Sequence, residues 1–254
     1  MLAAALVAAL VWVGILLMQG SGDTGDGGQT TAPATSAPPS IPEPSTTSSS
    51  PAATESTSPM PSSAPATLPA DEAAGVIWPD PAGTLRYENP EDAAAGFAEE
   101  FAGFTDPIYG EFMQGDSRSG ELEVRAVADG PVTTVLLRQF TGDQWYIIAA
   151  TTSEIDLESP EAREGISSPV ALSGTARAFE GLVEVQIRAH GISAPLGQGQ
   201  VIGGAGQNLE PFSQSLQWQN PGSGFGSLLL TVSTAKDGGV WAVEALPVGF
   251  AAQP

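Results

Sequence analysis

The stretch Ser168–Ala189, SPVALSGTARAFEGLVEVQIRA, decides the fold. In its second half, Val183, Val185 and Ile187 take every other position, and polar residues stand between them. Successive side chains of a strand point to opposite faces, so this period of two is typical of a half-buried strand. The first half alternates more loosely. The sequence therefore predicts two consecutive strands of a β-sandwich.

A corner at Phe179–Gly181 joins the two predicted strands. We expect Phe179 to plug the end of the core, so that its replacement by alanine would cost ~3–5 kcal/mol. Gly181 is expected to turn the chain with a positive φ. In the first strand, Gly174 and Ala176 are small, and a large side chain from a neighbouring strand is expected to lie across them.

The segment from Gly174, GTARAFEGLVEVQIR, resembles the first half of the immunoglobulin-like domain of bacterial spore-germination proteins, the second Gmad domain family. Three further segments follow in that family's order: PFSQSLQW at Pro211–Trp218, STAKDGG at Ser233–Gly239 and ALPV at Ala245–Val248. The similarity covers residues 166–250. It implies an extracytoplasmic, non-catalytic module and transfers no catalytic residue. Together with many alanines and glycines and a single lysine, it indicates an actinobacterial protein.

The amino-terminal residues 1–18 are apolar and carry no charge. About 20 helical residues span the ~30 Å hydrocarbon core of a bilayer. There is no A-x-A cleavage pattern and no basic segment before the apolar run, so the sequence favours an uncleaved transmembrane anchor at residues 1–19. A cleaved signal peptide is the alternative. The missing basic flank also leaves open that Met1 lies inside a longer reading frame.

Residues 20–75 are rich in Ser, Thr, Pro and Ala and contain almost nothing to bury. Such a segment cannot offset its ordering entropy, so we predict a disordered linker. The same composition is found in O-glycosylated stalks, which stays open as an alternative.

The chain has a formal net charge of −21, from 8 basic and 29 acidic residues. Residues 76–160 account for much of this, with sixteen acids against four arginines. Nucleic acids and anionic lipids attract basic surfaces, so both are excluded as partners. There is no cysteine, and the fold does not rely on disulfides.

Residues 76–160 are predicted to form an acidic α+β domain. Asn89 can cap a helix that begins at Pro90 and runs to about Phe104. Phenylalanines three or four residues apart give this helix one apolar face for the core. A short edge strand at Val76–Pro79 is expected before it.

An antiparallel meander is expected after the helix. Its three predicted strands are Glu121–Val127, Val132–Phe140 and Gln144–Thr151. The last two strands are joined by a hairpin turn at Thr141–Asp143, and Ile155 and Leu157 would extend the last strand. One helix on such a meander is a common α+β arrangement.

The stretch Thr105–Ser119 fits no regular element but carries Tyr109, Phe112 and Met113. These side chains would be costly to leave in water. One interpretation is a loop folded back over the open end of the helix–sheet layer. The other is a loop that binds a partner, since binding residues concentrate on loops.

Residues 161–254 are predicted to form the immunoglobulin-like sandwich. After the opening pair, further strands are expected at Gly197–Ile202, Phe212–Trp218, Ser227–Thr234 and Val240–Val248. Trp218 and Trp241 are expected in the core or at its rim, and a role as sugar platforms is the alternative.

The sequence lacks familiar catalytic patterns. There is no cysteine nucleophile, and a Ser-His-Asp triad would need His190, which is expected to be a surface turn residue. Gly203–Asn208 is glycine-rich but opens no helix, so it is not interpreted as a phosphate cradle. Carboxylate pairs are frequent in residues 76–160, and a glycosidase pair among them stays open.

The sequence thus predicts a mixed fold: a transmembrane helix, a disordered linker, an α+β domain and an all-β immunoglobulin-like sandwich. We expect a single-pass cell-membrane protein, with residues 20–254 outside the cytoplasm, that binds the cell wall or an envelope protein. No binding residue, metal ligand or cofactor is assigned. The alternative is an enzyme that acts on wall glycan through carboxylates of residues 76–160.

Overall fold

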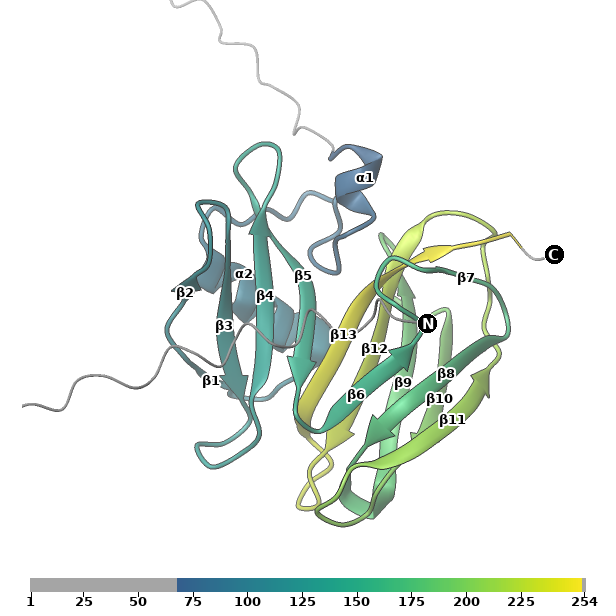
Figure 1. Cartoon of the computed structure of the whole chain (residues 1–254). Coiled ribbons are helices and arrows are strands. Elements are labelled where there is room, and N and C mark those ends of the chain that lie inside the picture. Colours follow the sequence, from purple (N-terminus) through teal and green to yellow (C-terminus); the bar gives the residue numbers. More distant parts are fainter. Residues whose placement is uncertain (1–67, 253–254) are drawn as a thin grey trace, which may run out of the picture. The chain divides into compact units, whose positions relative to one another are not determined.

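The computed structural model describes residues 68–252, which belong to one compact unit (Figure 1). The predicted anchor at residues 1–19 and residues 20–67 of the predicted linker lie outside the described residues. Within residues 68–252, no helix has the length and apolar character needed to cross a bilayer.

Helical elements are few and short. They are α1 (Ala70–Ala73), α2 (Pro90–Gly96), its π-helical continuation η1 (Phe97–Ala102) and the 3-10 turn η2 (Phe179–Gly181). The strands are β1 (Ile108–Tyr109), β2 (Met113–Gln114), β3 (Ser119–Arg125), β4 (Thr133–Gln139), β5 (Trp145–Thr152), β6 (Ile155–Ser159), β7 (Gly165–Ile166), β8 (Val170–Ala176), β9 (Leu182–Ala189), β10 (Gly197–Ile202), β11 (Glu210–Leu216), β12 (Phe225–Ser233) and β13 (Val240–Phe250). The described part is therefore mostly antiparallel β structure.

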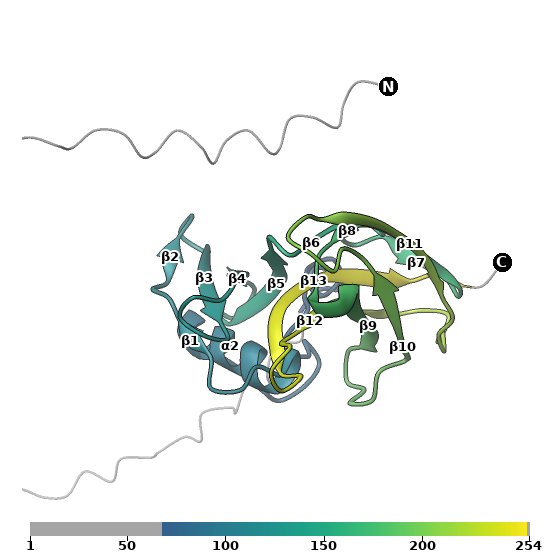
Figure 2. The same cartoon turned by 90° about the horizontal axis from the view of Figure 1, so that it is seen from below.

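The strands form two sheets. The large sheet has the order β1-β3-β4-β5-β13-β12-β9-β10, with β2 and β7 paired to its side, and the small sheet has the order β11-β8-β6. Figure 2 shows the small sheet on one face of the β13–β10 half and α2 on the opposite face of the β3–β5 half. Strands β13, β12, β9 and β10 of the large sheet pack against the small sheet, and together they make the predicted antiparallel sandwich.

Helix α2 begins as the sequence indicates. Asn89 Oδ1 accepts a hydrogen bond from Glu91 N at 3.2 Å, and Pro90 takes the first helical position. Phe97, Phe101 and Phe104 are all buried, as their spacing predicts. The last turns are π-helical rather than α-helical. The predicted linker extends too far, because Leu68 is buried and α1 follows it.

The stretch 105–119 is more regular than predicted. Strands β1 and β2 both pair with β3, so the segment lies along the edge of the large sheet. Phe112 packs edge-on against Trp145, with ring centroids 5.5 Å apart, while Met113 is exposed. This supports the interpretation of a segment folded over the layer, with Met113 left in solvent.

Strand β6 corrects the prediction that Ile155 and Leu157 extend the preceding strand. A turn follows β5, and β6 pairs with β8 in the small sheet. The sandwich therefore takes its first strand from before residue 160. Its large sheet is also continuous with the meander, because β13 pairs with β5 at Ala245 and Ala150.

The buried residues form two main cores, one on each face of the large sheet. Leu228, Leu230 and Val232 of β12 face the small sheet, whereas Leu229 between them belongs to the core beneath α2. Strands β12 and β13 thus serve both cores, as their almost uninterrupted burial shows.

The opening pair of strands behaves as predicted, with one correction. A Cβ at Gly174 would lie 3.1 Å from the ring of Phe212, so a large neighbour does lie across this strand. Gly181 has a φ of +74°. Phe179, however, is 56% exposed, and the expectation that it plugs the core is wrong. Ala178 takes the buried position at the corner, so the next side chain points outward.

Candidate functional site

The outward turn of Phe179 places it in a groove of about 840 Å³ at one end of the sandwich. Four segments form this corner groove: the β5–β6 turn, the corner itself, the loop before β11 and the β12–β13 turn. Val127 reaches it from the β3–β4 loop. The lining residues are Val127, Glu154, Arg177, Ala178, Phe179, Ala205, Gly206, Gln207, Asn208, Val232, Ser233, Thr234, Ala235, Lys236, Asp237 and Trp241.

Two aromatic side chains give the corner groove its apolar walls. Phe179 comes from η2, and Trp241 comes from the start of β13 and is half-buried. Trp241 packs partly against the sandwich core, and the groove is lined by the part that stays accessible. Large aromatic groups that remain accessible in a concave surface are typical of ligand sites rather than of packing.

The ion pair between Arg177 and Glu154 fixes the position of two segments that line the corner groove. Arg177 Nε and Nη2 each lie 2.8 Å from an oxygen of Glu154. Arg177 Nη1 also donates to Gln207 O at 2.8 Å, which ties the loop before β11 to the β5–β6 turn. Hydrogen bonds and charge from Glu154 raise the pKa of Arg177. The groove is therefore preorganised before any ligand arrives.

The β12–β13 turn supplies the remaining polar groups. Asp237 Oδ1 accepts hydrogen bonds from the Thr234 hydroxyl and from Gly239 N, and these bonds lower the pKa of Asp237. Lys236, the only lysine of the chain, lies next to it. The charged lining residues thus comprise two acids and two bases, and the corner groove has no net charge.

The corner groove brings together segments that are distant in the sequence. Ala178–Phe179 and Ala235–Asp237 belong to two of the segments that carry the family resemblance, and both line the groove. Sequence reasoning missed this site because it assigned Phe179 to the core. The sequence signal that could have revealed the site is Phe179, an aromatic residue directly before the turn at Glu180–Gly181, where φ is positive.

This sandwich has the immunoglobulin-like architecture, two antiparallel sheets packed face to face with loops gathered at both ends. Residues 154–239 match the family model described as the immunoglobulin-like domain of bacterial spore germination. The match confirms the resemblance and begins at Glu154, one residue before β6, in agreement with the place of β6 in the sandwich. No curated protein and no solved structure matches the chain.

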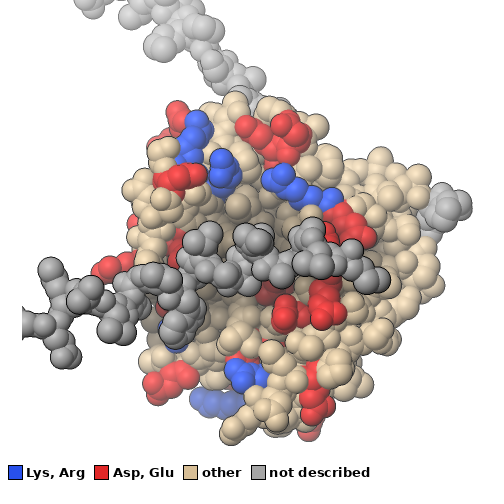
Figure 3. All heavy atoms as spheres, viewed as in Figure 1, with Lys and Arg blue, Asp and Glu red and all other residues tan. Residues whose placement is uncertain are grey.

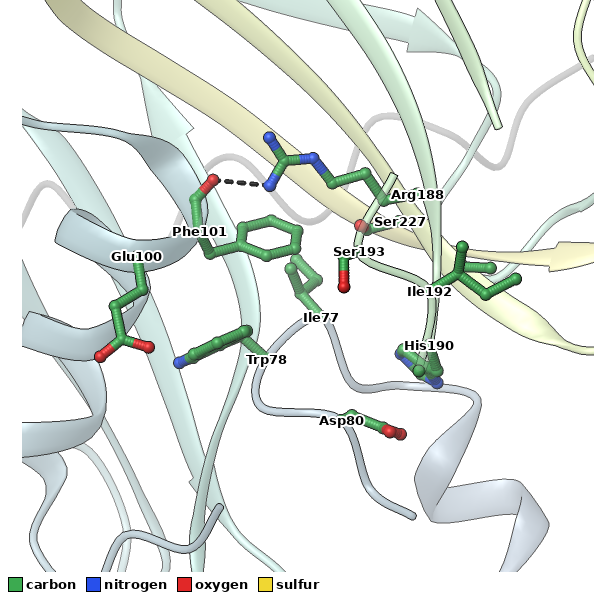
Figure 4. Close-up of a pocket in the computed structure, with 12 residues that line it drawn as sticks. Ile77, Trp78, Asp80, Glu100, Phe101, Arg188, His190, Ile192, Ser193 and Ser227 are labelled. Atoms are coloured by element: carbon green, nitrogen blue, oxygen red, sulfur yellow. Dashed lines mark hydrogen bonds between the residues drawn. The ribbon is translucent and has the colours of Figure 1, made fainter. Parts of the chain in front are cut away.

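A second hollow, the junction pocket, lies between the end of η1, the segment after α1 and the β9–β10 turn (Figure 4). Its volume is about 360 Å³. Figure 4 shows Trp78 and Phe101 on one side and Ile192, Ser193 and His190 on the other. Asp80, Glu100, Arg188 and Ser227 also line it.

Arg188 is the charged group at the top of the junction pocket in Figure 4. Its Nη1 donates to Phe101 O at 2.7 Å, and its guanidinium lies 4.5 Å from the Phe101 ring centroid. Gln186 Oε1 accepts from Nε and Nη2. Burial lowers the pKa of Arg188, and within residues 68–252 no carboxylate lies within ion-pair distance. The guanidinium of Arg188 therefore has hydrogen-bond partners within the fold and links η1 to β9.

His190 lies in the turn after β9, as expected, but it is half-buried and not a free surface residue. Its ring Nε2 lies 2.9 Å from Val76 O, so the Nε2–H tautomer donates a hydrogen bond to the segment after α1. Burial lowers the pKa of His190, although the hydrogen bond and Asp80 oppose this. The neighbouring turn folds against the α+β part, a long-range contact that the local sequence does not indicate.

The acidic side chains do not converge on one site. Figure 3 shows Asp and Glu dispersed over the viewed face, with Lys and Arg among them. Residues 68–252 contain no group of His, Asp and Glu arranged to hold a metal ion. Of the carboxylates in residues 76–160, Glu154 lines the corner groove, and Arg177 occupies both its oxygens.

The other sequence candidates fall in different places. Trp218 is buried in the sandwich core, where its indole N–H donates to Ser167 O at 3.1 Å. Trp241 lies at the rim and lines the corner groove. The glycine-rich segment 203–208 opens no helix and contributes its last four residues to the same groove. Tyr109 instead donates to Glu99 at 2.7 Å on the far part of the large sheet.

Proposed function

We propose that this chain is a membrane-anchored, extracytoplasmic protein that works by binding at the cell wall or to an envelope partner, without catalysis. The corner groove is its contact surface. The observation that carries this proposal is the exposed Phe179 of the family-matched segment, which lines one preorganised groove together with the half-buried Trp241. A single exposed phenylalanine is ordinary, but two aromatic side chains that line one concave surface are typical of a ligand site.

The proposed topology rests on the sequence before the described residues. The charge-free run at residues 1–18 has the length of a membrane span, and residues 20–67 have the composition of a tether. Such a tether would hold the sandwich away from the bilayer, where it could reach the wall. Protease added outside cells is expected to release a fragment that begins within residues 20–75.

The competing function is an enzyme that acts on wall glycan through carboxylates. Glu154 is the carboxylate of residues 76–160 that lines the groove, and its bidentate contact with Arg177 leaves it poorly placed to exchange a proton with a substrate. The carboxylate of Asp237 accepts hydrogen bonds from Thr234 and Gly239 of the same β12–β13 turn. This arrangement favours a binding role.

The test is cosedimentation of the full chain, kept in detergent, with purified Gram-positive wall, beside an assay for released reducing sugar. Saturable cosedimentation without sugar release is the predicted result. Sugar release that disappears in Glu154→Gln would establish the enzyme instead. Absence of any saturable association would contradict wall binding.

A further inference from the structure

We infer that the corner groove takes an uncharged oligosaccharide. This inference rests on the proposed function and names the ligand class of the same site. Its starting point is the mixture of groups in the groove, where two aromatic side chains stand beside short polar side chains and fixed charges.

The aromatic pair fits the apolar faces of sugar rings. The rings of hexoses present C–H groups on their faces and hydroxyl groups at their edges. Phe179 and Trp241 offer flat apolar surface, and the indole of Trp241 also carries an N–H donor. A stacked ring would cover this surface and place its hydroxyls near the polar lining.

The polar lining suits hydroxyl groups. Asn208, Gln207 and Ser233 provide neutral donors and acceptors around the groove. Arg177 has five N–H bonds. Nε, Nη1 and Nη2 each use one of them for Glu154 or Gln207, so two remain for a ligand. Asp237 presents a carboxylate that its low pKa keeps ionised as an acceptor.

The charge balance argues for a neutral ligand. The whole chain has a net charge of −21, yet Glu154 and Asp237 are matched in the groove by Arg177 and Lys236. An anionic polymer would be repelled by the surroundings, and a cationic one would find no excess of negative charge in the groove itself. A neutral ligand is not repelled by the negative surroundings and needs no excess of negative charge, so stacking and hydrogen bonds are enough to bind it.

The size of the groove sets the scale of the ligand. Its volume of about 840 Å³ lies in the upper part of the range typical of small-molecule sites. It has room for more than a single ring. The groove is open to solvent and not enclosed, so it can accept a segment of a longer chain.

The experiment measures competition for purified wall by neutral tetrasaccharides of glucose, N-acetylglucosamine, galactose and mannose, with a neutral tetrapeptide as the other arm. The full chain is used throughout, and its tryptophan emission is recorded. At least one tetrasaccharide is expected to displace the chain from wall and to shift the emission. The variants Phe179→Ala and Trp241→Ala should each weaken that competition about tenfold.

The matched control is Ile202→Ala, which removes an exposed apolar side chain that does not line the groove. It should leave the competition unchanged. If Phe179→Ala weakens wall binding but only the tetrapeptide competes, or nothing does, the oligosaccharide inference is overturned and the proposed function stands. If wall binding is indifferent to both groove variants, the groove is not the contact surface and both fall.

Discussion

Arg177 and Glu154 form a bidentate ion pair that links the end of the small sheet to the β5–β6 turn, with both N–O distances 2.8 Å. The backbone repeats the link, because Arg177 N donates to Glu154 O at 2.9 Å. Charge-assisted pairs of this geometry are stronger than single hydrogen bonds. The pair therefore fixes one wall of the corner groove from within the family-matched segment.

Replacing Glu154 by glutamine should lower the free energy of unfolding by about 1–2 kcal/mol, because a partly buried arginine loses its partner. Chemical denaturation measures the change. The matched control is Glu123→Gln at the exposed pair with Arg125, where the N–O distance is 3.1 Å. That change should cost less than ~0.5 kcal/mol. Equal losses in the two variants would show that the first pair has no special role.

Phe179→Ala should change the free energy of unfolding by less than ~1 kcal/mol, since the side chain is mostly exposed. Phe212→Ala is the comparison, because Phe212 is buried on β11 and lies across Gly174. It should cost ~3–5 kcal/mol. The melting temperatures of the two variants, compared with that of the parent, measure these losses of stability. A large loss for Phe179→Ala would mean that this ring packs in the core after all.

Much of the sandwich could be predicted from alternation alone. The strand Gly197–Ile202 has the predicted bounds, and the opening pair has its predicted faces. The hairpin turn predicted at Thr141–Asp143 does join β4 to β5, with positive φ at Gly142 and Asp143. These features depend on neighbours in the sequence, and local patterns carry that information.

The rest depends on contacts between distant residues. Strand β5 pairs with β13 at Ala150 and Ala245. The sequence of neither strand indicates that the other is its neighbour. Strand β6 looks like a continuation of β5 until a turn sends it to the other sheet. The corner groove is built from several loops, and the exposure of Phe179 follows from backbone angles that its own residue type does not specify.

Gly181→Val should lower the free energy of unfolding by about 2–3 kcal/mol. The residue has a φ of +74°, which a β-branched side chain rarely adopts, and a Cβ there would lie 2.7 Å from Gly203 O. Gly206→Ala is the control, because no atom lies within 4 Å of a Cβ at that position. It should change stability by less than ~1 kcal/mol. Similar melting temperatures for both variants would contradict the account of the corner.

Glu244 should make stability depend on pH. Burial raises the pKa of Glu244, the hydrogen bond from Thr152 N at 3.1 Å opposes the rise, and the charge of Asp156 adds to it. Together they raise the pKa of Glu244 to about 8. The unfolded chain releases this proton near pH 4.5, while the folded chain keeps it until about pH 8. The free energy of unfolding therefore falls as pH rises through this window and levels off above it.

Glu244→Gln removes this dependence, because an amide keeps the acceptor for Thr152 N without a charge. The variant should match the parent at pH 4.5 and exceed its stability at pH 9 by about 2 kcal/mol, a value reduced for partial exposure. Urea denaturation across this range gives the difference. A difference that stays constant with pH would show that Glu244 is ionised in the folded chain at neutral pH.

The central claim is that the corner groove makes the contact, and the dissociation constant for purified wall tests it most directly. The full chain is compared with Phe179→Ala/Trp241→Ala and with Ile108→Ala/Met113→Ala, whose exposed side chains lie outside the groove. The account predicts a loss of at least about tenfold for the groove pair and less than about twofold for the other. Equal affinities for the two folded double variants would contradict it.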